Sequence, residues 1–62
     1  MKIMYTVVAF KNGKVIEEKK YMSFKEGRER VSQLERVAHK THSLLNVVLF
    51  ENEIKLLERF FG

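Results

Sequence analysis

The sequence contains no cysteine and no proline, and it has only three glycines among its 62 residues. Without cysteine no disulfide can form, and the chain suits a reducing compartment such as the cytoplasm. A domain this short buries only about 60% of the surface that its unfolded chain exposes, so it usually needs a disulfide, a metal or a partner subunit for stability. Disulfides are excluded and no metal-ligand set stands out, which leaves a well-formed fold, a partner subunit or both.

The sequence also lacks a long apolar run. No segment approaches the ~20 consecutive apolar residues of a transmembrane helix. The stretch "MKIMYTVVAF" is basic and then apolar, but charge returns at Lys11 and no small-residue cleavage site follows, so no signal peptide is predicted. We therefore expect a cytoplasmic protein with no membrane partner. The formal net charge of +4 is a mild basic bias that would tolerate an acidic partner or nucleic acid.

The N-terminal third has the pattern of a β-hairpin. Residues 3–10 are mostly β-branched or aromatic, and Asn12-Gly13 separates them from a second run, "KVIEEKKYM". Asn-Gly between two such runs predicts a two-residue turn, because both central residues of a type I′ turn need φ > 0. The turn also sets the register. It pairs Phe10 with Val15, Val8 with Glu17, and Met4 with Tyr21.

A helix is predicted next. Ser23 begins "SFKE", a capping box, and the helix runs from Phe24 to about Lys40. Helical spacing places on one arc the residues Phe24, Gly27, Val31, Leu34 and Ala38. Gly27 has two explanations: the helix approaches a sheet closely there, or the glycine is merely tolerated at a cost of up to about 1 kcal/mol.

The stretch "VVAFKNGKVIEE" that begins at Val7 returns forty residues later as "VVLFENEIKLLE". This echo predicts a second hairpin that turns at Asn52-Glu53. Glu53 stands where the first turn has glycine, and φ > 0 is unfavourable for glutamate, so Glu53→Gly is expected to stabilise the fold. The competing interpretation is a short C-terminal helix over residues 52–61, capped by Asn52. The echo does not require an internal duplication of the sequence, because two hairpins with the same structural requirements would have similar sequences.

Together these elements predict an α+β fold, ββαββ, in a single domain over residues 1–62. The second and fourth strands carry most of the strand charges, and charged side chains on edge strands deter unwanted pairing. The predicted sheet is therefore four-stranded and antiparallel, in the order 2-1-3-4, with one helix on one face.

One helix covers only one face of such a sheet, so the sequence predicts an uncovered apolar face. The helix is expected to cover Ile3, Tyr5, Val7, Ala9, Ile16, Leu45, Val47, Leu49, Leu56 and Phe60. A contiguous apolar patch normally marks an interface, and a two-fold axis would let the patch cover itself in a homodimer. The predicted partner interface consists of Met4, Val8, Phe10, Val15, Tyr21, Val48, Phe50, Leu57 and Phe61.

No catalytic arrangement is recognisable in the sequence. It holds no glycine-rich phosphate loop, no paired-carboxylate signature and no zinc spacing, and Ser23 has a sufficient role as a helix cap. His39 and His42 stand three residues apart, as chelating histidines on a helix can, but no third ligand is evident and helix ends commonly carry cationic side chains. We therefore predict no enzyme activity, no metal and no cofactor.

The preferred function is a small non-catalytic protein–protein interaction or regulatory module that forms a homodimer, with another protein as a further candidate partner. The alternative is a small basic nucleic-acid-binding protein. One version of this alternative uses as phosphate contacts Lys25, Arg28, Arg36 and Lys40. A second version uses as base-stacking platforms Phe10, Tyr21, Phe50 and Phe61. No RNP-type motif, zinc finger or helix-turn-helix accompanies either version.

Overall fold

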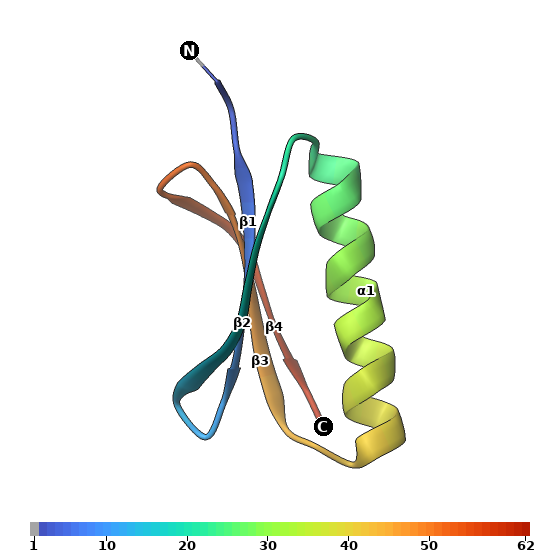
Figure 1. Ribbon diagram of the computed structural model, residues 1–62. Helices are drawn as coiled ribbons and strands as arrows, with labels where there is room; N and C mark the ends of the chain where they lie inside the picture. Colours follow the sequence, from blue (N-terminus) through green and yellow to red (C-terminus); the bar gives the residue numbers. More distant parts are fainter. Residues whose placement is uncertain (1) are drawn as a thin grey trace.

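The computed structural model describes residues 2–62, which form four strands and one helix (Figure 1). In chain order these are β1 Tyr5–Lys11, β2 Lys14–Tyr21, α1 Phe24–Thr41, β3 Leu45–Glu51 and β4 Ile54–Phe61. The strands form one sheet in the order β2-β1-β3-β4, and every neighbouring pair is antiparallel. The predicted ββαββ fold is confirmed, and the alternative of a helix over residues 52–61 is wrong.

The two hairpin turns differ in their backbone. Asn12 (φ 54°) and Gly13 (φ 77°) are both left-handed, as a type I′ turn requires. In the second turn Asn52 has a φ of 54°, but Glu53 is not among the residues with positive φ. The strain expected at Glu53 is therefore absent, because only the first central residue of this turn, Asn52, has a left-handed backbone.

Asn52 also connects the second turn to the start of β1. Its backbone N–H donates to the carbonyl oxygen of Met4 at 2.8 Å. Its side-chain Oδ1 accepts from the backbone N–H of Met4 at 3.1 Å. An asparagine tolerates the left-handed conformation and supplies a side-chain acceptor, so both properties of this residue are used here.

Both ends of α1 are capped. Ser23 has an extended backbone, and its Oγ accepts from the backbone N–H of Glu26 at 3.2 Å, as the capping box predicts. The helix ends at Thr41 and is followed by His42, whose φ of 52° is left-handed, and the N–H of Ser43 donates to the carbonyl oxygen of Ala38 at 3.0 Å. This is the hydrogen bond of a Schellman motif, and it turns the chain back toward the sheet.

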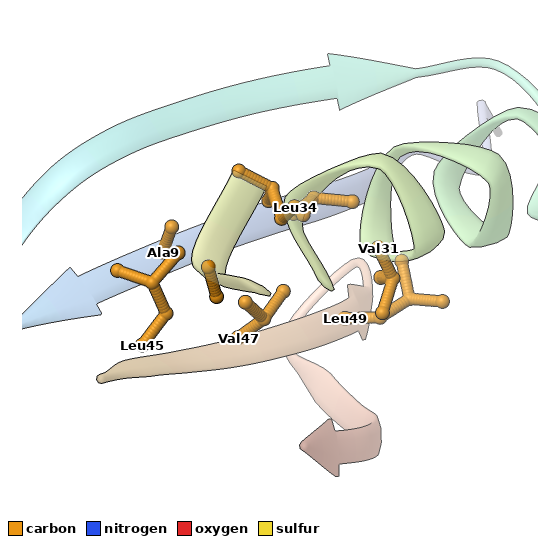
Figure 2. Packing of buried hydrophobic residues seen from close by; sticks show 8 residues of the cluster. Ala9, Val31, Leu34, Leu45, Val47 and Leu49 are labelled. Carbon is orange, nitrogen blue, oxygen red and sulfur yellow. The ribbon is translucent and has the colours of Figure 1, made fainter. Parts of the chain in front are cut away.

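The core lies between α1 and the two central strands, where side chains of the helix point toward β1 and β3 (Figure 2). Its buried members are Val7, Ala9, Val31, Leu34, Ala38, Leu45, Val47 and Leu49. Gly27 is buried against the same strands, and a β-carbon added to it would lie 2.9 Å from Cδ1 of Leu49. Of the two explanations for this glycine, close approach of the helix to the sheet is the correct one.

Each edge strand contains a β-bulge. Phe10 pairs with Val15 as predicted, but Ala9 pairs with Glu17, so Ile16 is an extra residue in β2. In β4 the extra residue is Leu56. Beyond each bulge the side chains of the edge strand exchange faces relative to the predicted register, because successive residues of a strand point to opposite sides.

The bulges correct four predicted positions. Tyr21, Leu57 and Phe61 were expected on the uncovered face, but they pack on the helix side against the core. Phe60 was expected beneath the helix, but it pairs with Asn46 and lies on the other side. The central strands β1 and β3 contain no bulge in the described residues, and their faces are as predicted.

The echo in the sequence has a structural counterpart. The bulged residues Ile16 and Leu56 are forty positions apart in the chain, as are the paired central residues Val8 and Val48. The two hairpins are therefore built alike, and their turns lie at opposite ends of the sheet (Figure 1). An approximate two-fold axis normal to the sheet relates them, and α1 covers only one side of this arrangement.

Candidate interaction surface

The sheet has one face that no element among residues 2–62 covers, and we call it the open face. Figure 1 shows α1 on one side of the sheet and both hairpin turns curling away toward the other. By register and strand alternation, the open face carries Thr6, Val8, Phe10, Val15, Glu18, Lys20, Asn46, Val48, Phe50, Lys55, Glu58 and Phe60. Over β3 and β4 the face is hollowed into a groove of about 620 Å³.

Six of the nine predicted interface residues lie on this side: Met4, Val8, Phe10, Val15, Val48 and Phe50. Val8 and Val48 form the centre, and their neighbours leave them only 8% and 5% exposed. Val15 is 55% exposed on one edge and Phe60, which the sequence reasoning placed beneath the helix, is 76% exposed on the other. The open face is thus apolar along its middle and at one end.

Charged side chains flank this apolar middle, which the sequence reasoning did not anticipate at these positions. Glu18 and Lys20 lie on β2, and Lys55 and Glu58 lie on β4. Their positions follow from the β-bulge in each edge strand. Neither strand contains a residue type that would have predicted a bulge from the sequence.

A hydrogen-bonded cluster lies at the β4 edge of the open face. Glu58 accepts from Nζ of Lys55 at 3.0 Å and from Nδ2 of Asn46 at 3.0 Å. These two donors, Lys55 first, lower the pKa of the Glu58 carboxyl below its usual value. Oδ1 of Asn46 is buried and accepts no hydrogen bond within residues 2–62. This cluster holds the Glu58 carboxylate at the rim of the groove.

The other pronounced ion pair lies on the helix side and is structural. Nε of Arg30 donates to Oε2 of Glu17 at 2.6 Å, and its Nη2 pairs with the second carboxylate oxygen. Nη1 of the same arginine donates to Oε1 of Gln33 at 2.9 Å. The hydrogen bond from Arg30 is the main cause that lowers the pKa of Glu17. This fork fastens the edge strand β2 to α1.

Of the two candidate sets of nucleic-acid-binding residues, the structure brings the cationic set together and separates the aromatic set. Lys25, Arg28, Arg36 and Lys40 are all exposed on α1, and at 3.6 residues per turn they share the arc opposite the core. Glu29 lies within the same arc. The aromatic set is split, because Phe10 and Phe50 lie on the open face while Tyr21 and Phe61 pack on the helix side.

Within residues 2–62 no three histidine, aspartate or glutamate side chains are grouped as metal ligands would be. His39 lies in the last turn of α1, and its carbonyl oxygen accepts from the backbone N–H of His42, the left-handed residue that caps the helix. The one helix in this part of the chain, α1, is not long and apolar enough to cross a membrane. Comparisons with protein-family models, with curated proteins and with solved structures each returned no match.

Proposed function

We propose that this protein is a small, non-catalytic protein–protein interaction module that forms a homodimer through the open face. The observation that carries the proposal is that no described element covers the open face, although Val15 and Phe60 are exposed there and Phe10 and Phe50 are only half-buried. Contiguous apolar patches on small domains mark interaction sites. A second copy is the preferred occupant, because an isologous dimer covers the patch with itself.

The exposed surface of the chain supports the same proposal. The chain exposes 4700 Å², whereas a compact monomer of its mass exposes about 4200 Å². Ordinary strand spacings make the open face about 19 Å wide and about 23 Å long, or about 440 Å² before side-chain relief is added. Stable interfaces bury about 800 Å² per partner. At about 440 Å² the face lies below this figure, in the size class of weak and transient interfaces, so we expect dissociation in the micromolar range.

Sedimentation velocity from about 1 to about 200 μM tests self-association, because this range brackets a micromolar dissociation constant. Two matched variants locate the interface. Val15 is 55% exposed on the open face and Val37 is 46% exposed on α1. Val15→Lys should weaken the dimer, and Val37→Lys should leave it unchanged. A wild-type chain that stays monomeric throughout this range overturns the proposal of a homodimer.

Nucleic-acid binding is the second candidate, and the shared outer arc of Lys25, Arg28, Arg36 and Lys40 favours its phosphate-contact version. These cations span about 22 Å along the helix, at 1.5 Å per residue. If all four bind phosphates of a duplex, the logarithm of the association constant should fall with the logarithm of salt with a slope of about −3.6. Absence of binding to generic DNA and RNA at low salt would remove this candidate.

The proposed location is the cytoplasm, on the basis that the sequence has no cysteine and so needs no oxidising compartment. Another protein is the second candidate occupant of the open face. Affinity capture with wild type and with Val15→Lys tests this candidate, because another protein bound to this face should be recovered with the wild type and lost from the variant.

A further inference from the structure

The open face is organised in rows that run across the strands, and its charges are sorted among them. The lysine row contains Lys20, Thr6, Phe50 and Lys55. The glutamate row beside it contains Glu18, Val8, Val48 and Glu58. The phenylalanine row follows on the other side of the glutamate row and contains Val15, Phe10, Asn46 and Phe60. Each charged row thus has an apolar or neutral centre and two like charges at its ends.

A fourth row lies beyond the lysine row. Met4 precedes β1 and bonds to Asn52, so strand alternation puts Met4 on the open-face side, and Met22 follows β2 in a bend at the same end of the sheet. Met22 is 75% exposed. We call this the methionine row. Along the strands the order is therefore methionine, lysine, glutamate and phenylalanine.

A two-fold axis along the strands would bring like charges together. In a face-to-face dimer the axis lies in the plane between the two sheets, and an axis parallel to the strands lays each row over the same row of the other copy. Lys20 would then face Lys55 of the partner subunit, and Glu18 would face Glu58 of the partner subunit. Facing like charges in an interface oppose association.

A two-fold axis across the strands reverses the order of the rows and removes this conflict. With the axis between the lysine and glutamate rows, Lys20 faces Glu18 of the partner subunit and Lys55 faces Glu58 of the partner subunit. The phenylalanine row then lies over the methionine row, so Phe10 faces Met4 of the partner subunit. The charged residues of the lysine and glutamate rows are thus matched with opposite charges, and the phenylalanine row, which also contains Asn46, lies over the methionine row.

The usual angle between packed sheets does not disturb this matching. Aligned sheets cross at about 30°, and the edge strands lie about 7 Å from the centre, so edge residues are displaced by about 4 Å. Lysine and glutamate side chains are long enough to span such a shift. Within residues 2–62 neither Glu18 nor Lys20 has an ion-pair partner in its own chain, so both are free to bond across the interface.

We propose that two copies pack open face on open face about an axis across the strands, with Lys20 of each copy paired to Glu18 of the partner subunit. The inference rests on the proposed homodimer and specifies its geometry. The charges at the edges of the face select this arrangement. The apolar surface that the dimer buries comes from Phe10, Val15, Phe50 and Phe60.

Charge reversal at these two positions tests the geometry. Glu18→Lys and Lys20→Glu each replace two attractive contacts per dimer with two repulsive ones. Each exposed contact changes affinity a few-fold, so each variant should raise the dimer dissociation constant by about tenfold or more at low salt. An equimolar mixture of the two variants restores both attractive contacts, so it should form a heterodimer with near wild-type affinity. Salt at about 0.5 M should shrink these differences.

Other geometries predict different results, and each would overturn the inference. With the axis along the strands, Glu18→Lys tightens the dimer, because the new lysine faces Glu58 of the partner subunit. With the axis through the glutamate row, Lys20→Glu leaves affinity unchanged, because Lys20 then faces Val15 of the partner subunit. Both side chains are exposed on an edge strand, so circular dichroism should show that the variants fold. A monomeric wild type would instead remove the proposed homodimer itself.

Discussion

Replacing Gly27 with alanine tests how closely α1 lies on the sheet, because two effects of opposite sign compete at this position. In an exposed helix interior, alanine in place of glycine stabilises by about 1 kcal/mol. At Gly27 the new β-carbon would lie 2.9 Å from Cδ1 of Leu49 and 3.7 Å from Cβ of Tyr5. Carbon atoms pack at about 3.5–4.0 Å, so the Leu49 side chain has to shift.

The cost of that shift decides the sign. Leu49 is 0% exposed, so its terminal methyl has no solvent to move into. Overpacking a well-packed core costs about 1–3 kcal/mol, which exceeds the gain in helix propensity. We expect Gly27→Ala to lower the free energy of unfolding by about 1 kcal/mol. For a domain of this size, that lowers Tm by about 4–8 °C.

Thermal melts followed by circular dichroism, at one fixed protein concentration, provide the assay. Ser32→Ala on the exposed side of α1 is the control for helix propensity and should raise Tm slightly. The double variant Gly27→Ala with Leu49→Val removes the methyl group that obstructs the alanine, so it should be more stable than the sum of the single effects predicts. A raised Tm for Gly27→Ala alone would refute the reasoning and mean that the glycine is merely tolerated.

Three further predictions concern the ion pair and the turns. Glu17→Gln should lower the free energy of unfolding by about 1 kcal/mol at neutral pH, because the charged fork to Arg30 is lost. Arg30 holds the pKa of Glu17 below its ordinary 4.5, so this contribution is complete above pH 4.5 and disappears as pH falls through the folded-state pKa. Urea titrations at several pH values should show the wild type and variant converging in acid. Gly13→Ala should cost about 1–2 kcal/mol, since position 13 has positive φ. Glu53→Gly should cost about 0.5–1 kcal/mol through unfolded-state entropy; a raised midpoint in a thermal melt would reveal strain at Glu53.

Local chemistry made much of the fold predictable from the sequence. Asn12-Gly13 is suited to two consecutive left-handed residues, so it specifies the first hairpin without help from the rest of the chain. Ser23 and the helical spacing of apolar residues likewise specify where α1 begins and which side of it is buried. The charge difference between central and edge strands was enough to predict the strand order. Each of these signals can be read from the residues of one element, or by comparing the composition of two elements, without knowing which distant residues are in contact.

The faces of the edge strands were decided by tertiary structure. In β2 the sequence reads Glu17-Glu18-Lys19-Lys20, and β4 contains the doublets Leu56-Leu57 and Phe60-Phe61. Because each doublet repeats one residue type, shifting the register by one residue leaves the same kinds of side chain on each face. The sequence pattern is therefore compatible with either register.

Contacts between distant segments remove this ambiguity. The bulge in β2 turns Glu17 toward Arg30 on α1, and the bulge in β4 turns Leu57 and Phe61 onto the core. The bulge in β2 also puts Glu18 on the open face, where its charge enters the proposed dimer geometry. A bulge leaves one residue unpaired in the ladder, and here it is offset by packing that exists only once the helix lies on the sheet. The sequence by itself determined which elements form and in what order they pair, whereas their assembly decided which side chains remain on the surface.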